Sequence, residues 1–134
     1  MDQQGGTYAL ILKLEKETQI RIGRLGTFSF PPGYYVYVGS ALGSGGLQAR
    51  LARHQRSDKK LHWHIDYLLA HARIVGIQVD HSGKRLECRW AQVLLSEPWA
   101  RVVAPRFGAS DCRCLTHLIY AGKDHVRSLA LGSR

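Results

Sequence analysis

The feature that most constrains the fold is a run of aromatic and β-branched residues at positions 34–38, with the sequence Tyr-Tyr-Val-Tyr-Val. Pro31, Pro32 and Gly33 precede it, and a glycine-rich loop follows from Gly39, so turn-forming residues bound the run on both sides. Such side chains fit the half-buried surface of a sheet. The run therefore predicts a strand over 34–38.

Hydrophobic periodicity predicts the other elements. Alternating or mixed apolar patterns indicate strands over 7–14, 19–22, 74–79 and 115–120. Apolar residues recurring at helical spacing and runs of good helix formers indicate helices over 47–56, 61–72 and 85–95, the last stopped by Pro98. This order of strands, helices and strands is typical of an α+β domain with a small, mostly antiparallel sheet flanked by helices.

The length of 134 residues corresponds to one domain. We expect it to span 1–134, with a core over about 6–121 and a flexible tail over 122–134. No apolar run approaches the roughly 18 residues that cross a bilayer, and the first residues do not resemble a secretory signal. Together with an odd number of cysteines, three, this predicts a cytoplasmic protein with reduced thiols.

The charge is strongly positive, with 19 lysines and arginines against 10 acidic residues. Such an excess favours a polyanionic partner, nucleic acid first and an anionic membrane second. A basic protein with no nucleic-acid role is the alternative. On the helix over 47–56 and just after it, we expect Arg53, Arg56, Lys59 and Lys60 to contact backbone phosphates without reading bases. The other interpretation of these residues is a solvated basic face.

Short motifs lie on successive predicted elements. Gly6-Thr7-Tyr8 opens the first strand and Tyr37-Val38-Gly39 closes the strand over 34–38. Arg50 and His54 are four residues apart, hence on one face of the helix predicted over 47–56. Glu87 lies near the start of the helix predicted over 85–95. This order resembles the GIY-YIG nuclease superfamily over about residues 6–97. Residues 34–41, 62–66 and 107–112 are similar to an uncharacterised archaeal and bacterial branch, also found fused to endonuclease III-like proteins.

The resemblance implies a divalent-metal-dependent endonuclease that hydrolyses phosphodiester bonds, in DNA more than RNA, during repair or recombination. It implies that Glu87 holds Mg²⁺ or Mn²⁺ as a Lewis acid and that Arg50 meets the scissile phosphate as a fork. Tyr8 would take the proton of the attacking water, which requires a phenol pKa well below about 10. Tyr37 would position the phosphate or the water, and His54 would be a second phosphate donor or a proton relay.

Structural interpretations stand beside these roles. Taken singly, Tyr8 and Tyr37 are ordinary sheet residues, Arg50 belongs to a solvated face, and Glu87 is an acid favoured at a helix N-terminus. The chain departs from the superfamily pattern at Ser40, where many relatives carry lysine, and in an inserted hairpin over 15–33. It also has no separate DNA-reading domain. These departures favour a non-catalytic nucleic-acid-binding module as the alternative function.

Three cysteines and a histidine suggest another possibility. Cys112, Cys114 and His117 lie within six residues, and with Cys88 they could form a tetrahedral Zn²⁺ site in an interaction domain that serves a repair-protein partner. The spacing of one residue between two cysteines is tighter than in common zinc motifs, so buried thiols are the favoured interpretation.

Three further positions invite a structural interpretation. The spacing places His62 and Asp66 on one helix face and His64 on another, which predicts a pair that satisfies a buried polar group rather than a metal centre. The three tryptophans are expected in the core rather than as stacking platforms for bases.

Overall fold

A four-stranded antiparallel sheet forms the centre of the molecule, with the strand order β5-β1-β4-β6. Its strands are β1 (Gly6–Leu14), β4 (Gly33–Ala41), β5 (Arg73–Asp80) and β6 (Leu118–Gly122). This computed structural model describes residues 5–41, 46–110 and 112–123. Most of the tail predicted over 122–134 therefore lies outside the described residues.

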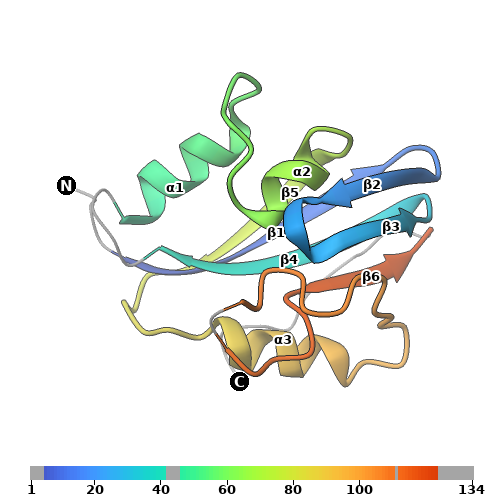
Figure 1. Ribbon diagram of the computed structural model, residues 1–134. Coiled ribbons are helices and arrows are strands. Elements are labelled where there is room, and N and C mark those ends of the chain that lie inside the picture. The colour runs from blue at the N-terminus through green and yellow to red at the C-terminus, as the bar shows by residue number, and fades with distance from the viewer. Residues whose placement is uncertain (1–4, 42–45, 111, 124–134) are drawn as a thin grey trace.

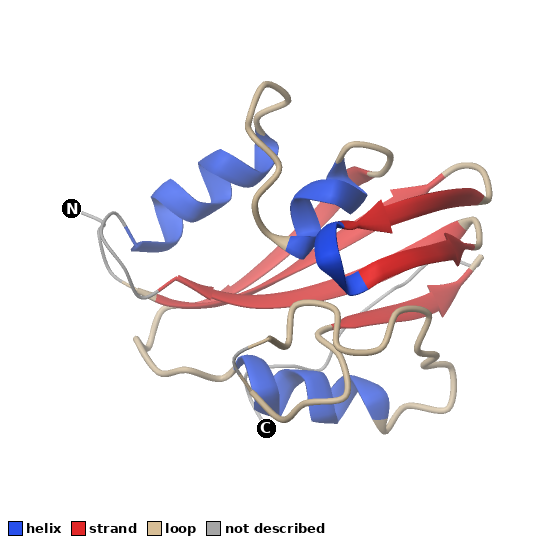
Figure 2. Ribbon diagram, viewed as in Figure 1, coloured by secondary structure: helices blue, strands red, loops and turns tan. Residues whose placement is uncertain are grey.

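Two layers cover the sheet. On one face lie α1 (Gly46–Gln55), α2 (His64–Leu69) and a hairpin of β2 (Thr18–Ile22) and β3 (Gly26–Phe30), whose strands are joined by the 3₁₀ turn η1 (Gly23–Leu25) (Figure 1). On the other face lies α3 (Glu87–Leu95) (Figure 2), whereas the chain after it returns to the first face, where Phe107 and Gly108 contact His64 of α2. The predicted α+β class is confirmed. Among the described residues, no helix has the length and apolar character needed to cross a membrane.

The alternation of β1 explains the two layers of core. Leu10 and Leu12 point toward the α1–α2 face, where they are fully buried in one apolar cluster. Ala9 points the other way, into a second cluster with Trp90 and Leu94 of α3. Because β1 and β4 are central strands with both faces covered, their sequences are apolar at successive positions rather than only at alternate ones. Trp90 is a core residue, as predicted.

Most predicted elements are confirmed to within a few residues, and three differ. The hairpin expected over 15–33 is present, but its second strand, β3, was not located, since its glycine and the prolines after it were interpreted as turn signals. The helix expected over 61–72 begins only at His64, because the Asp66 carboxylate accepts the backbone N–H groups of His62 and Trp63 and thereby caps it. The last strand begins at Leu118, and it continues to Gly122, where fraying was expected.

Candidate active site and metal site

The two motifs of the first and fourth strands lie side by side. In the antiparallel pairing of β1 with β4, Tyr8 is opposite Gly39 and Thr7 is opposite Ser40. The Tyr8 ring crosses the backbone of β4 so closely that a Cβ at Gly39 would lie 2.6 Å from the phenol oxygen. Only glycine leaves room for the ring at this position. The pairing therefore places the phenol groups of both motifs at the centre of the sheet, with the rings of Tyr8 and Tyr37 6.4 Å apart.

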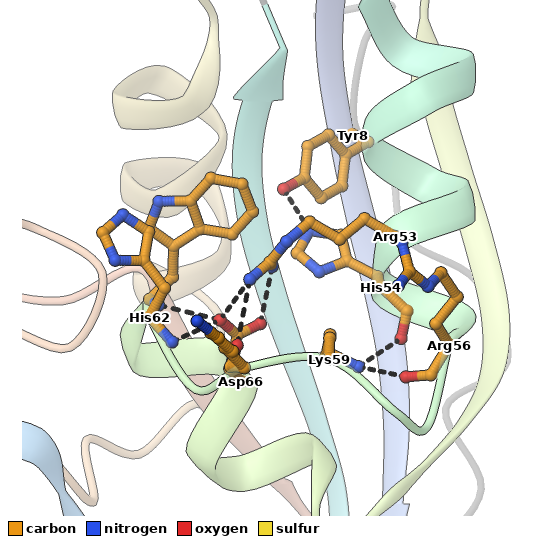
Figure 3. Close-up of polar contacts among 9 residues, drawn as sticks. Tyr8, Arg53, His54, Arg56, Lys59, His62 and Asp66 are labelled. Carbon is orange, nitrogen blue, oxygen red and sulfur yellow. Dashed lines mark hydrogen bonds and ion pairs between the residues drawn. The ribbon is translucent and has the colours of Figure 1, made fainter.

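Helix α1 places His54 against Tyr8. The phenol oxygen of Tyr8 lies 2.6 Å from Nε2 of His54 (Figure 3), and both residues are almost completely buried. Burial, together with the positive charge of Arg50, lowers the pKa of His54 to about 4. His54 is therefore neutral at pH 7, and its Nδ1 has no hydrogen-bond partner among the described residues. The pair joins a neutral imidazole to a phenol.

Both phenols are harder to ionise than a free tyrosine. Burial raises the pKa of Tyr8 to about 12, although the neighbouring Arg50 opposes the shift. Burial also raises the pKa of Tyr37 well above its usual value, and the nearby Tyr8 adds to the effect. These shifts run opposite to the lowered pKa that the water-proton role of Tyr8 requires. At neutral pH both side chains are protonated and can donate hydrogen bonds.

A polar cleft of about 260 Å³ brings together three of the five predicted catalytic residues. Tyr37, Arg50 and Glu87 line it directly, whereas Tyr8 and His54 are not among its lining residues. Other side chains complete the wall, and they include Ser40, His62, Trp63, His64, Arg85 and Ser110. All of these except Arg85 lie in the segments 34–41, 62–66 and 107–112 that resemble the family branch. The sequence nevertheless assigned none of them a role in the site, because segments far apart in the sequence meet here only in the fold.

Ser40 connects the acidic and basic sides of the cleft. Its hydroxyl donates to Oε2 of Glu87 at 3.1 Å, and its carbonyl accepts from Nη1 of Arg50 at 2.8 Å. Nη2 of Arg85 also lies 3.5 Å from Oε2 of Glu87. The other carboxylate oxygen, Oε1, is buried and has no partner among the described residues. Oε2 of Glu87 is thus held by Ser40 and Arg85, whereas Oε1 has no partner in the described part of the chain. A carboxylate oxygen of this kind is a suitable ligand for a hard cation.

Arg53 is held by Asp66. Its guanidinium makes two hydrogen bonds of 2.9 and 3.0 Å to the carboxylate (Figure 3) and lies 4.1 Å from the ring centroid of Trp63. Burial acts to raise the pKa of Asp66, but the hydrogen bonds from Arg53 and from two backbone N–H groups outweigh it, so this pKa is lowered. The backbone N–H groups of His62 and Trp63 also donate hydrogen bonds to Asp66. We refer to Arg53, Asp66 and these two N–H groups as the Asp66 network.

The other basic residues predicted to contact phosphate lie beside this network, outside the cleft lining. Nζ of Lys59 donates to the backbone carbonyls of His54, at 3.2 Å, and of Arg56. Arg56 makes an exposed ion pair with Asp58 at 3.4 Å. The carbonyl of Lys60 accepts a hydrogen bond from Arg53. Arg53, Arg56 and Lys59, which the sequence predicted to contact phosphates, are therefore already engaged by groups of the protein itself.

The two histidines before and at the start of α2 differ from expectation. His62 precedes the helix and contacts Asp66 through its backbone N–H, not through its imidazole. His64 lines the cleft, and its Nδ1 accepts the backbone N–H of Gly108 at 2.8 Å. Burial lowers the pKa of His64, which favours the neutral ring, and because Nδ1 is an acceptor the proton of that ring lies on Nε2.

The cysteines and His117 form one compact group beside the cleft. The ligand atoms of Cys88, Cys112, Cys114 and His117 all lie within 4.8 Å of one another, and this group could hold a metal ion. Nε2 of His117 is 3.4 Å from Sγ of Cys112 and 3.7 Å from Sγ of Cys88. Burial raises the pKa of the Cys88 thiol, and the two neighbouring thiols raise it further. We call these four residues the cysteine cluster.

Comparison with known families gives one match. A family described as a domain of unknown function, DUF123, matches residues 7–131. This range includes every strand, apart from Gly6 at the start of β1, and all residues of the cleft and of the cysteine cluster. Neither the curated proteins nor the solved structures gave a match.

Proposed function

The chain belongs to the DUF123 family, and we propose that it is a divalent-metal-dependent endonuclease of the kind implied by its resemblance to the GIY-YIG superfamily. The observation that carries the proposal is the convergence of Tyr37, Arg50 and Glu87 in one polar cleft. The pairing of Gly6-Thr7-Tyr8 with Tyr37-Val38-Gly39 on adjacent strands also supports it.

The cleft is suited to a phosphodiester. Ser40 and the ring of Trp63, whose centroid is 4.3 Å from the Arg50 guanidinium, fix that guanidinium in place. Its remaining N–H groups can meet two phosphate oxygens as a fork. The protonated phenol of Tyr37 can donate to the same group. A site with these donors favours an anion with several oxygens.

Glu87 fits the role of a cation ligand, because Oε1 of its carboxylate is unpartnered in the described residues. A Mg²⁺ or Mn²⁺ ion bound there would supply Lewis-acid stabilisation of the leaving oxygen. Ser40 and Arg85 hold the other carboxylate oxygen and thereby orient the side chain. Since a single carboxylate leaves most of the coordination sphere to water and substrate, Mg²⁺ suits this donor set.

The Tyr8–His54 pair is the proton route of the proposal. A standing phenolate is excluded by the raised pKa of Tyr8. Instead, the phenol oxygen takes a proton from water while the phenol proton passes to Nε2 of His54, 2.6 Å away. The water becomes the hydroxide that attacks phosphorus, and His54 becomes positively charged. Because Tyr8 is buried in this structure, the route requires substrate binding to open its ring to the cleft.

The test is cleavage of branched, nicked and single-stranded DNA and RNA in Mg²⁺ or Mn²⁺. Glu87→Gln should lower the cleavage rate about a thousandfold and retain binding, since it removes transition-state stabilisation by the cation. Arg50→Ala should weaken both, because the guanidinium meets the phosphate in ground and transition states alike. Glu97→Gln, which removes an acid just beyond the other end of α3, is the matched control. Tight binding without cleavage by the wild type would establish the non-catalytic module instead.

The cysteine cluster favours a second, compatible role, and we propose that it binds a structural zinc ion. Three thiolates and one imidazole are soft ligands that select Zn²⁺ over Mg²⁺, and four protein ligands close a tetrahedral site. Zinc would thus stabilise the wall of the cleft rather than take part in hydrolysis. Metal analysis of the purified protein should find about one zinc per chain. A fully folded chain purified without zinc would exclude this role.

A further inference from the structure

A second open hollow, of about 770 Å³, adjoins the cleft. Its lining residues are Arg21, Gly23, Arg24, His62, His64 and Tyr67, and we call it the hairpin groove. His62 and His64 line both hollows, so the two share a wall at the start of α2. No acidic residue lines the hairpin groove. A ligand that occupies the cleft and extends across this wall would therefore meet positive charge on both sides.

The hairpin β2–η1–β3 supplies the outer wall of the groove (Figure 1). Gly23 has φ +49°, and a Cβ there would lie 3.3 Å from the phenol oxygen of Tyr67. Glycine therefore lets η1 lie directly against the Tyr67 ring, which fixes the turn to α2. The wall is thus packed against the body of the protein, although the hairpin forms a separate sheet.

Two arginines project from this wall. Arg21 of β2 and Arg24 of η1 are both exposed, and neither pairs with an acidic group in the part of the chain that the structure describes. Only a long contact of 3.4 Å joins Nε of Arg21 to the carbonyl of Gly23. By contrast, Arg53 is committed to Asp66 and Lys59 to backbone carbonyls. Outside the cleft, Arg21 and Arg24 of the hairpin therefore have no acidic partner among the described residues, whereas Arg53 and Lys59 are engaged within the protein.

We propose that the hairpin groove binds the single-stranded stretch of nucleic acid that flanks the phosphate held in the cleft; the proposal rests on the proposed function of that cleft. Arg21 and Arg24 neutralise the phosphates of the flanking nucleotides. The half-buried ring of Tyr67 lines the groove, where a base would stack on it. A positively charged groove with an aromatic wall is the arrangement that binds single strands without reading their sequence, which selects an unpaired strand over a duplex.

His64 adds a donor at the junction of the two hollows. Its Nδ1 accepts the N–H of Gly108, so the proton of the neutral ring lies on Nε2. This N–H can donate to a phosphate or sugar oxygen of the strand that crosses from one hollow to the other. The junction is therefore polar without being negatively charged, as a phosphate backbone requires.

The experiment measures binding of a fluorescent oligothymidylate by anisotropy across a salt series, without added Mg²⁺ or Mn²⁺. Arg21→Gln and Arg24→Gln should each lower the log–log salt slope by about 0.7, the value for one phosphate contact on a single strand. Tyr67→Leu should weaken binding about tenfold, whereas Tyr67→Phe should bind as the wild type does. Arg101→Gln removes an exposed arginine outside both hollows and should leave the slope unchanged.

Three outcomes would overturn the proposal: no binding by the wild type, an unchanged slope in both arginine variants, or equal binding by the Leu and Phe variants at position 67. Circular dichroism and thermal melting show whether each variant is folded, and Tyr67→Phe keeps the packing against Gly23. Because binding is measured without the cation, it is independent of cleavage. If the groove variants bind weakly and the wild type does not cut DNA, the proposed binding role of the groove is supported and the proposed nuclease activity is refuted. Cleavage that depends on Glu87, with normal binding by the groove variants, would do the reverse.

Discussion

The Asp66 network and the cysteine cluster are both groups of polar side chains packed close to the cleft, yet they differ in what completes them. In the network, the buried carboxylate of Asp66 receives two hydrogen bonds from Arg53 and two from backbone N–H groups. In the cluster, three thiols and the imidazole of His117 converge, with contacts of 3.4 and 3.7 Å. The first group is balanced by charges of the chain itself, whereas the second is a set of ligand atoms facing one another.

This difference separates two uses of buried polarity. Opposite charges that meet within one chain lower each other's cost of desolvation, and they fix where α2 begins. Thiols and an imidazole that meet without an opposite charge gain a balancing charge only when a cation binds between them and displaces the thiol protons. The contribution of the cysteine cluster to stability should therefore depend on whether Zn²⁺ is present in solution. The contribution of the Asp66 network should not depend on metal and should change only when one of its residues is substituted.

Removal of zinc should have the largest effect. Zinc binding to small structural sites contributes about 10–16 kcal/mol at pH 7, which is as large as the whole stability of a typical domain. A strong chelator should therefore lower the thermal midpoint substantially or unfold the chain. The midpoint should return with Zn²⁺ and not with Mg²⁺, as scanning calorimetry would show. An identical midpoint with and without chelator would leave the cysteine cluster as buried thiols only.

Breaking the Asp66 network should have the next largest effect. Asp66→Asn keeps the size of the side chain but leaves the guanidinium of Arg53 without its countercharge. Because Asp66 is fully buried and Arg53 is partly exposed, we expect a loss of about 3 kcal/mol in the free energy of unfolding, measured by urea denaturation. Asp58→Asn breaks the exposed pair with Arg56 and should change it by less than about 1 kcal/mol. Equal effects of the two variants would show that the network contributes no more than a surface pair.

Acid should destabilise the protein in a graded way. The pKa of His54 is lowered from 6.5 to about 4 in the folded state, so between these values the unfolded chain binds the proton more readily. Stability is thus highest above pH 6.5, and it falls by about 1.4 kcal/mol per pH unit as the pH decreases toward 4.

The contribution of His54 can be isolated by difference, because the lowered pKa values of His64 and His117 act in the same direction. His54→Gln retains an acceptor for the phenol of Tyr8 but cannot bind the proton. The urea midpoint of this variant should depend less steeply on pH between 6.5 and 4 than that of the wild type. The same slope in both would mean that His54 titrates normally in the folded protein.

The sequence predicts the parts of the fold that depend on periodicity within one element. The alternation of β1 and the aromatic run of β4 were sufficient to place both strands, a run of good helix formers placed α1, and Pro98 marked the end of α3. The strand β3 could not be predicted, because turn-forming residues dominate its surroundings and its stability comes from pairing with β2. The start of α2 depends on a capping contact of Asp66, which spacing alone does not indicate.

Prediction of the site was limited for a related reason. Spacing shows which residues share a face of an element, but not which faces meet in the fold. Arg50 and Glu87 therefore could be named individually, whereas their connection through Ser40 could not. The partner of Arg53 is thirteen positions away across a loop, and the arginines of the hairpin groove lie in a segment that looked like an insertion. The raised pKa of Tyr8 follows from burial, which is a property of the whole fold.

The position of β1 between β4 and β5 has a consequence for synthesis. Tyr8 lies opposite Gly39 on one side and Val79 on the other, so β1 remains unpaired until strands that follow it in the chain have been made. Pairings over such long stretches of chain form slowly, and unpaired strand edges invite aggregation until they close. Glu87 follows β5, which makes the cleft one of the last features to assemble. A ribosome that stalls before residue 80 would hold a chain whose central strand still has one open edge.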